Sequence, residues 1–354
     1  MASIVFKDEH SDSMSSTHLT LGIETSCDET AAAVYDPRGG VRSSVLFSQV
    51  AIHREFGGVL PEAASRSQLE KISPIVQGAL EDAGVRLDEI ATVAVTNGPG
   101  LPGSLLIGLC FAKAVAWSSE RKLVGVDHLE GHIFSPFLDH DVPFPHLCLT
   151  ASGGHTSLCL VRDFGVYEVI GHTLDDAAGE AFDKVAKLLG LPYPGGPEIE
   201  RCAQAQNFKD FFDYPRGKHT TLDFSFSGLK TAVLYSLVNR GAYDLKARQL
   251  LDTSQGLKEE VASSLLVCVA DIFARKLARA LEENPDVCAV TFVGGVARNN
   301  YIRGVLDVLC QKRGLPFFTP SPQYCTDNAA MIAFVGNYKA QRGEYAPWDL
   351  DIEV

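Results

Sequence analysis

Two histidines stand four residues apart in the segment His128, Leu129, Glu130, Gly131, His132, which lies between two apolar runs. In a helical turn, residues at this spacing differ by only about 40° around the axis, so both imidazoles would face one point. Such a pair can bind a metal ion. The alternative interpretation is that two unrelated histidines share this spacing by chance.

Glu130 is two residues from each histidine, so it would face another side of the same turn. In the metalloprotease motif His-Glu-x-x-His, the general base directly follows the first histidine. Glu130 is in a different position. The pattern therefore argues against a protease-like metal hydrolase.

A metal site that leaves room for substrate needs at least one more ligand, preferably an oxygen donor. Asp327 is the leading candidate, because it stands between Thr326 and Asn328 just before a helical pattern over 329–341. However, Thr326 or Asp327 is also well placed to cap that helix at its N-terminus. The residues alone leave both roles of Asp327 open.

The surrounding chain repeats one design in its two halves. Polar turns interrupt β-type apolar runs over 20–36 and 147–161, and Ser26 and Ser152 hold matching places in them. Strand–helix–strand patterns follow over 91–126 and 287–318, each with a glycine-rich turn where open α/β sheets bind ligands. We therefore expect an internally duplicated α/β protein with a ligand between its halves.

Glycine-rich turns without a Walker-A lysine indicate a phosphate-bearing ligand whose oxygens accept from backbone N–H groups. The best such turn is Ser152, Gly153 and Gly154, where adjacent glycines permit close approach and positive φ. Asp183 is predicted on the exposed face of a helix over 175–189, where its carboxylate suits ribose hydroxyls or is simply solvated. The Gly and Pro cluster that follows is expected to expose backbone amides near Gly195 and Gly196.

Composition limits the class of protein. The apolar fraction of 46% over 354 residues fits a soluble α/β protein with two cores, and no apolar run is long enough to span a membrane. Nine scattered cysteines without Cys-x-x-Cys indicate reduced thiols in an intracellular compartment. The formal charge of −13 argues against broad, non-specific nucleic-acid binding.

Taken together, nine motifs closely resemble a known family, the universal tRNA threonylcarbamoyladenosine synthases of the bacterial and organellar type called TsaD. The motifs occur in family order over about residues 20–342: LGIETSCDET, SQV with FGGVLPEAASR, GPGLPGSLLIG, HLEGH, SGGHTSL, DDAAGEAFDK with LLGLPYPGGP, LDFSFSGLKTA, GGVARNN and CTDNAAMIA. Small departures include Arg298 before Asn299, where alanine is common, and neither this nor any other removes an expected ligand.

The resemblance implies a two-lobed, actin-like ATPase fold of the sugar kinase, Hsp70 and actin superfamily. We expect a disordered tail at 1–19, a first lobe at 20–127 completed by 339–354, and a second lobe at 128–338 that carries the metal and nucleotide sites. The implied reaction transfers the threonylcarbamoyl group of threonylcarbamoyl-AMP to the exocyclic amine of the adenosine 3′ of the anticodon, in tRNAs that read codons beginning with A.

The resemblance also assigns site residues. One Fe²⁺ or Zn²⁺ ion per subunit would be held by His128, His132 and Asp327. Asp28 and Glu29 would act as acid/base or positioning groups. The adenylate, and ATP or ADP in the same cleft, would contact a larger set: Thr150, Ala151, Ser152, Gly153, Gly154, Asp183, Gly196, Glu200 and Asn299.

The implied partners are tRNA, a paralogous actin-like protein of the TsaB type, a small P-loop ATPase of the TsaE type and the enzyme that forms the adenylate. The expected location is the cytoplasm, or else a mitochondrial or plastid matrix. Three other functions are alternatives. An actin-like small-molecule kinase has no need of His128 and His132, a non-catalytic paralogue would lack them, and a metalloprotease would place Glu130 differently.

Overall fold

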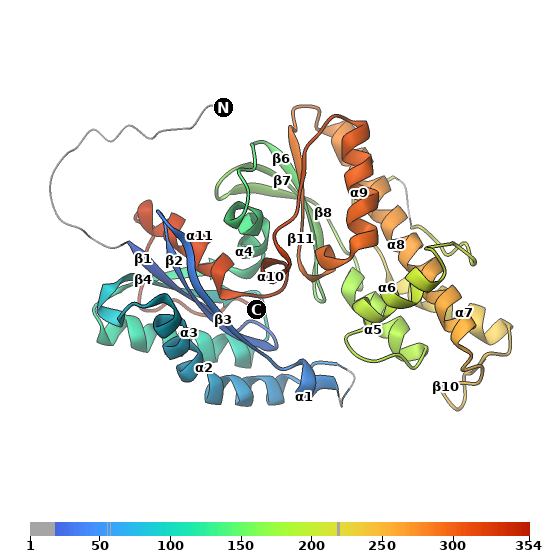
Figure 1. Ribbon diagram of the computed structural model, residues 1–354, viewed down its shortest axis with the longest axis horizontal. Coiled ribbons are helices and arrows are strands. Elements are labelled where there is room, and N and C mark those ends of the chain that lie inside the picture. The colour runs from blue at the N-terminus through green and yellow to red at the C-terminus, as the bar shows by residue number, and fades with distance from the viewer. Residues whose placement is uncertain (1–17, 55, 57, 218–219) are drawn as a thin grey trace.

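The computed structural model describes residues 18–54, 56, 58–217 and 220–354 (Figure 1). The predicted tail at 1–19 lies outside the described residues except for its last two, and the first strand begins at the second of these, Leu19. None of the described helices combines the length and the apolar character of a membrane span.

The first half of the chain forms a mixed five-stranded sheet in the order β3-β2-β1-β4-β5. Its strands are β1 (Leu19–Glu24), β2 (Glu29–Asp36), β3 (Gly40–Ser48), β4 (Ile90–Gly98) and β5 (Lys122–Asp127). β1 pairs antiparallel with β2 and parallel with β4. The predicted hairpin and the predicted strand–helix–strand unit of this half are therefore confirmed.

The second sheet has the order β12-β11-β6-β7-β8, which is the order of the first sheet read from its other edge. Its strands are β6 (His146–Ala151), β7 (Thr156–Asp163), β8 (Val166–His172), β11 (Ala289–Val293) and β12 (Phe317–Phe318). β6 pairs antiparallel with β7 and parallel with β11, as β1 does with β2 and β4. The internal duplication is confirmed by this repeated topology.

The helical elements of the first half are α1 (Val50–Arg54), α2 (Pro61–Ala83), η1 (Leu87–Glu89), α3 (Pro102–Ser118), α4 (His128–Phe134) and η2 (Ser135–Leu138). α2 begins at Pro61, a residue suited to the first turn because it needs no N–H partner there. The helix ends at Gly84, whose φ of 66° is readily adopted by glycine.

The remaining elements belong to the second half: α5 (Ala178–Leu188), α6 (Gly195–Ala205), α7 (Ser227–Asn239), β9 (Tyr243–Asp244), β10 (Gln249–Leu250), α8 (Gln255–Glu283), η3 (Gly295–Arg298), α9 (Asn300–Lys312), α10 (Pro322–Cys325) and α11 (Ala329–Gln341). The long helix α8 buries one side in the largest apolar core, together with α5, α6 and α7.

Two helices connect the halves. α11 follows the second sheet in sequence but lies against the first, beside β1 and β4 (Figure 1). The contact is close, because a Cβ on Gly22 would lie 2.3 Å from the Ala329 carbonyl oxygen. One apolar cluster contains Val126 of the first sheet, Val161 of the second, Ile133 of α4 and residues of α11. The predicted lobe boundaries therefore remain an interpretation.

Candidate metal and adenylate site

The two histidines lie on one face of α4. Asp127 begins this helix, and its side chain accepts a hydrogen bond from the Glu130 N–H at 2.9 Å. His128 and His132 are buried, with relative exposures of 5% and 0%, and their ring centroids are 4.7 Å apart. The predicted helical turn is confirmed, and it brings both imidazoles to one point.

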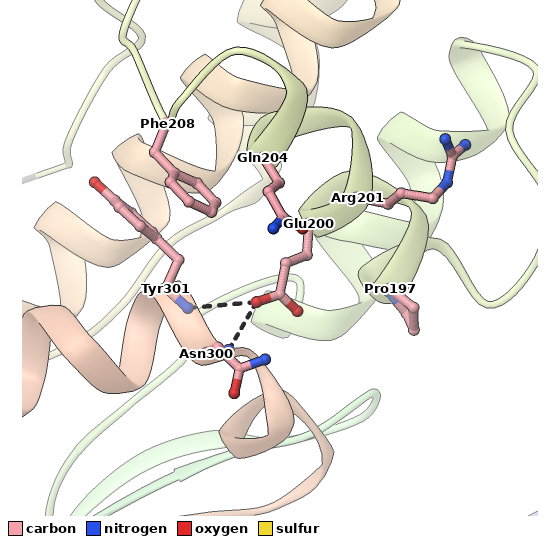
Figure 2. Close-up of a pocket in the computed structure, with 7 residues that line it drawn as sticks. All are labelled: Pro197, Glu200, Arg201, Gln204, Phe208, Asn300 and Tyr301. Carbon is pink, nitrogen blue, oxygen red and sulfur yellow. Dashed lines mark hydrogen bonds between the residues drawn. The ribbon is translucent and has the colours of Figure 1, made fainter.

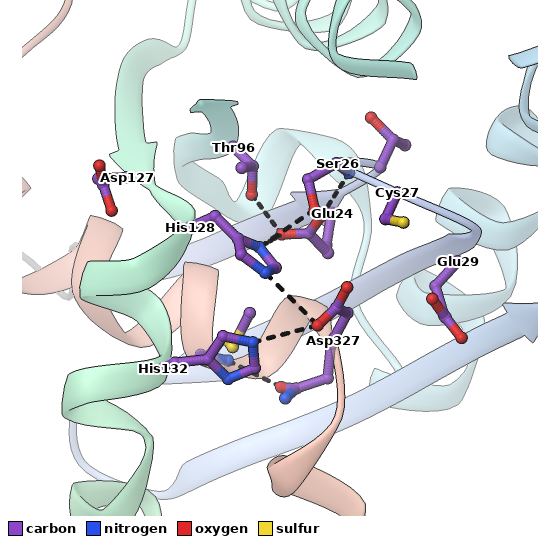
Figure 3. Close-up of polar contacts among 12 residues, drawn as sticks. Glu24, Ser26, Cys27, Glu29, Thr96, Asp127, His128, His132 and Asp327 are labelled. Atoms are coloured by element: carbon purple, nitrogen blue, oxygen red, sulfur yellow. Dashed lines mark hydrogen bonds and ion pairs between the residues drawn. The ribbon is translucent and has the colours of Figure 1, made fainter. Parts of the chain in front are cut away.

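Asp327 reaches the same point from the segment between α10 and α11 (Figure 3). Its Oδ1 atom is 3.4 Å from His128 Nε2 and 3.1 Å from His132 Nε2. The prediction that Thr326 or Asp327 caps α11 is wrong. The cap is Asn328, whose extended backbone aims its side chain at the Met331 N–H, 3.0 Å away. Asp327 is therefore left to face the histidines.

These three side chains fit a divalent transition-metal ion. One ligand atom from each of His128, His132 and Asp327 lies within 4.8 Å of the others. Two imidazole nitrogens and one carboxylate oxygen suit Fe²⁺ or Zn²⁺, and such a set leaves coordination positions open. Both Nε2 atoms point at the carboxylate, so one bound ion would replace these contacts.

Two side chains behind His128 orient this residue. Its Nδ1 atom is 3.1 Å from Glu24 Oε2 and 3.1 Å from Ser26 Oγ (Figure 3). Thr96 donates to the same Glu24 oxygen at 2.5 Å. A carboxylate behind a ligating histidine fixes the ring and its tautomer, which is common at metal sites.

The opposite charges of His128, Asp327 and Glu24 determine the protonation states of these three residues. Burial alone would lower the pKa of His128, but the charges of Asp327 and Glu24 hold it well above its usual range. Burial alone would raise the pKa of Asp327, but the charge of His128 and hydrogen bonds from His128 and His132 hold it well below. Burial alone would raise the pKa of Glu24, but the charge of His128 and hydrogen bonds with His128 and Thr96 together lower it. Both carboxylates are thus ionised at neutral pH.

Glu130 has a separate role. Its Oε2 atom is 2.6 Å from Lys339 Nζ of α11, and its side chain is 7% exposed. This ion pair joins α4 to α11, and it leaves Glu130 unsuited as the general base of a metal hydrolase.

Asp28 and Glu29 lie at the turn between β1 and β2. Asp28 is 9% exposed. The pKa of Glu29 is held well above its usual range by burial and by the negative charges of Asp28 and Asp327, while Ser48 Oγ donates to its Oε1 at 3.3 Å. Glu29 therefore belongs to the electrostatic surroundings of Asp327.

The second hairpin carries the glycine turn. Ser152 N donates to the His155 carbonyl at 2.8 Å, and Ser152 Oγ accepts from the His155 N–H at 3.1 Å. A Cβ on Gly153 or Gly154 would meet nothing within 4 Å, so a ligand can approach this backbone closely. Neither glycine has a positive φ. Thr150 and Ala151 are buried in β6.

Asp183 does not lie on an exposed helix face, which corrects the prediction. It is partly buried in α5, and its Oδ1 atom accepts from the Gly195 N–H at 2.6 Å. Burial raises its pKa to about 6 despite this hydrogen bond. The expected exposure of the Gly195 amide is wrong for the same reason, whereas Gly196, in the first turn of α6, keeps open space beside its Cα atom.

Glu200 and Asn299 meet at the N-terminus of α9. Glu200 Oε1 accepts from the Asn300 N–H at 2.7 Å, and Asn299 caps α9 by accepting from the Ile302 N–H. Beside them lies a cavity of about 470 Å³, whose rim includes the stacked rings of Phe208 and Tyr301, 4.4 Å apart (Figure 2). Pro197, Glu200, Arg201, Gln204 and Asn300 complete its lining.

Sequence reasoning missed four residues of this site: Glu24, Ser26, His155 and Tyr193. Burial lowers the pKa of His155, and the nearby charges of His128 and His132 lower it further, which places the glycine turn close to α4. Burial and the charges of Asp28 and Asp183 raise the pKa of Tyr193. Its position inside the motif GLPYPGGP was the available signal for Tyr193.

The family model described as TsaD, tRNA N6-adenosine threonylcarbamoyltransferase, matches residues 40–334. A protein of this name from Salinibacter ruber is 47% identical over 335 residues, covering 94% of this chain and 98% of the relative. Another from Pelobacter propionicus is 46% identical over 336 residues, covering 94% and 96%.

Solved structures share the fold at low identity. The ROK hexokinase of Thermus thermophilus has a TM-score of 0.51 and 14% identity, covering 92% of this chain and 100% of that one. Component A of the (R)-2-hydroxyglutaryl-CoA dehydratase of Acidaminococcus fermentans has a TM-score of 0.52 and 15% identity, covering 91% and 99%. The predicted two-lobed, actin-like fold is confirmed, and by its sequence the chain belongs to the TsaD family of tRNA N6-adenosine threonylcarbamoyltransferases.

Proposed function

We propose that this chain transfers the threonylcarbamoyl group from threonylcarbamoyl-AMP to the N6 amine of the adenosine 3′ of the anticodon, in tRNAs that read codons beginning with A. The observation that carries this proposal is the convergence of His128, His132 and Asp327 in a member of this family. No feature of the described residues favours the kinase or hydrolase alternatives.

We assign His128, His132 and Asp327 as the ligands of one Fe²⁺ or Zn²⁺ ion. When bound, this ion supplies a Lewis acid for the carbamoyl or phosphate oxygens of the substrate. Glu24 and Ser26 orient His128 toward it through Nδ1. The buried setting of the ligands strengthens the electrostatic interactions that the chain's own residues make with the substrate.

The adenylate is bound by residues of the second sheet and its helices. Ser152, Gly153 and Gly154 offer open backbone to the phosphate, with Thr150 and Ala151 supporting the turn. We place the ribose near Asp183 and Gly196, and the adenine in the cavity beside Glu200 and Asn299. The Glu200 side chain lines this cavity and accepts from the N-terminus of α9, so it shapes the cavity as well as contacting the base, and Asn299 caps the same helix. ATP or ADP would use the same cleft.

The transfer exchanges one acyl bond for another. The N6 amine of adenosine attacks the carbamoyl carbon, a C–N bond forms, and the C–O bond of the mixed anhydride breaks with its electron pair leaving on AMP. The amine also loses one proton. Asp28 and Glu29, at the turn beside Asp327, are the groups placed to accept this proton or to hold the amine in line.

The chain is proposed to work with partners. Its charge of −13 disfavours binding tRNA unaided, which supports a complex with a paralogous actin-like protein and a small P-loop ATPase. α2 and α3 expose Leu69 at 65% and Leu106 at 43%, and these neighbouring helices are the surface we assign to the paralogous partner. A separate adenylate-forming enzyme supplies the substrate, and the cytoplasm, or else an organellar matrix, is the proposed location.

The test is a reconstituted reaction. Purified protein and its partners are incubated with threonine, bicarbonate, ATP, the adenylate-forming enzyme and unmodified tRNA, and the digested tRNA is analysed for the modified nucleoside by mass spectrometry. We expect threonylcarbamoyladenosine only when every component is present. Absence of product from the complete mixture, together with phosphorylation of a small molecule by ATP, would support the kinase alternative instead.

A further inference from the structure

The turn that carries Asp28 and Glu29 is held by a buried side chain of α2. Gln68 is 0% exposed, and its Nε2 atom lies 3.2 Å from the Thr25 carbonyl oxygen, 2.9 Å from that of Cys27 and 3.0 Å from that of Glu29. The two N–H bonds of this one amide group are thus shared among three carbonyl oxygens of a single turn. Buried carbonyl groups need such donors, and here a distant helix supplies them.

α3 supports the same turn from another side. Ser104 Oγ donates to the Cys27 carbonyl at 3.2 Å, and Thr25 Oγ1 donates to the Ser104 carbonyl at 2.9 Å. The Leu101 N–H donates to the Ser26 carbonyl at 2.7 Å. The turn between β1 and β2 therefore depends on two helices that are remote from it in sequence.

This turn also reaches the metal ligands. Ser26 Oγ is 3.1 Å from His128 Nδ1, and the Ser26 N–H donates to Glu24 Oε1 at 2.5 Å (Figure 3). Any shift of the turn would move Ser26 against His128 as well as moving Asp28 and Glu29. A displacement of this kind, by about 1 Å, can cost on the order of 100-fold in rate.

We propose that Gln68 is a positioning residue for the transfer reaction, which holds the turn from Thr25 to Glu29 so that Asp28 and Glu29 face the substrate. The inference rests on the proposed function for its effect on rate. The restraint of this turn by Gln68 can be measured separately, without any reaction.

The experiment compares two substitutions with a matched control. Gln68→Met keeps the length of the side chain without a donor, and Gln68→Asn keeps the amide but is too short to reach the three carbonyls. Gln311→Met makes the same change at an exposed helical glutamine whose amide donates to Asp307 at 2.9 Å. The full chain is used with its partners, and thermal unfolding identifies the variants that fold.

Two readouts are taken on each folded variant. Hydrogen exchange of the peptide covering residues 25–30 should become faster in both Gln68 variants. The kcat of threonylcarbamoyl transfer should fall about 10- to 100-fold, with a KM for the adenylate within roughly twofold of wild type. Gln311→Met should match wild type in both readouts.

If hydrogen exchange of this peptide is unchanged in the Gln68 variants, the inference is overturned whatever their kcat. Faster hydrogen exchange combined with a wild-type kcat would also overturn it. Failure of the wild-type protein to form product would instead refute the proposed function. In that case hydrogen exchange still decides whether Gln68 holds the turn.

Discussion

The three proposed ligands are side chains that have no capping role in their own elements. Asp127 caps α4 and Asn328 caps α11, so the carboxylate of Asp327 and the imidazoles of His128 and His132 are free to converge. At each helix, one residue caps the N-terminus and its neighbour faces the proposed metal site.

Asp327→Asn should lower the metal affinity of the purified protein by at least about 10-fold, because a neutral amide is a poorer ligand than a carboxylate. Asp307→Asn, at a partly exposed aspartate of α9, is the matched control and should bind metal as wild type does. Metal content measured by elemental mass spectrometry after dialysis checks this. Equal iron or zinc in wild type and Asp327→Asn would remove Asp327 from the site.

Asp183 should make folding stability depend on pH. Its pKa rises from 3.8 to about 6 on folding, so the folded chain keeps a proton that the unfolded chain has lost. This contribution is fully present below about pH 4 and is lost as pH rises through about 6, with an upper limit of about 3 kcal/mol.

Asp183→Asn removes this titration. Between about pH 4 and pH 6, the free energy of unfolding should therefore fall less steeply in the variant than in wild type. Chemical denaturation at several pH values provides the comparison. Parallel profiles for the two proteins would show that Asp183 does not titrate in this range.

At the scale of elements, α11 packs closely against the first sheet because a glycine at the contact has no side chain. A Cβ on Gly336 would lie 2.2 Å from Ala94 Cβ of β4. Gly336→Ala should therefore lower the free energy of unfolding by about 1 to 3 kcal/mol through overpacking. Gly304→Ala is the control, because that exposed glycine of α9 has nothing within 4 Å of a Cβ, and the change should be neutral or stabilise by up to about 1 kcal/mol.

Thermal or urea unfolding of both variants measures the difference. The same stability for Gly336→Ala and Gly304→Ala would mean that α11 does not approach β4 as closely as described.

The hairpins and the strand–helix–strand units could be predicted from sequence, because their apolar periods are local and occur twice. The cap of α11 could not, since Thr326, Asp327 and Asn328 are adjacent residue types that all can cap, and only the backbone angles select Asn328. The pairing of Glu24 with His128 and the three bonds of Gln68 join positions far apart in sequence. No local pattern reports such contacts, so these partners could not be predicted from sequence.

At the scale of the whole molecule, the proposed partner surface lies on α2 and α3, the same helices that hold the turn from Thr25 to Glu29. Leu69 follows Gln68 directly on α2, and Leu106 lies on α3. Leu69→Glu should weaken association with the paralogous partner by at least about 10-fold, because it puts a charge into an apolar interface. The melting temperature of the isolated chain should stay the same, since Leu69 is 65% exposed.

Analytical ultracentrifugation of the two proteins together checks this prediction. Val166→Glu is a control at an exposed apolar residue of the second sheet, with 50% exposure. Equal association of Leu69→Glu and wild type would place the partner on another surface.

The central claim is that a transferase acts through the group formed by His128, His132 and Asp327. The direct measurement is threonylcarbamoyladenosine formed per tRNA in the reconstituted reaction, compared for wild type, His128→Ala and the exposed-histidine control His172→Ala. The account predicts product from wild type and His172→Ala, and at least about a 100-fold loss in His128→Ala with a matching loss of bound metal. Equal product from His128→Ala and wild type would contradict it.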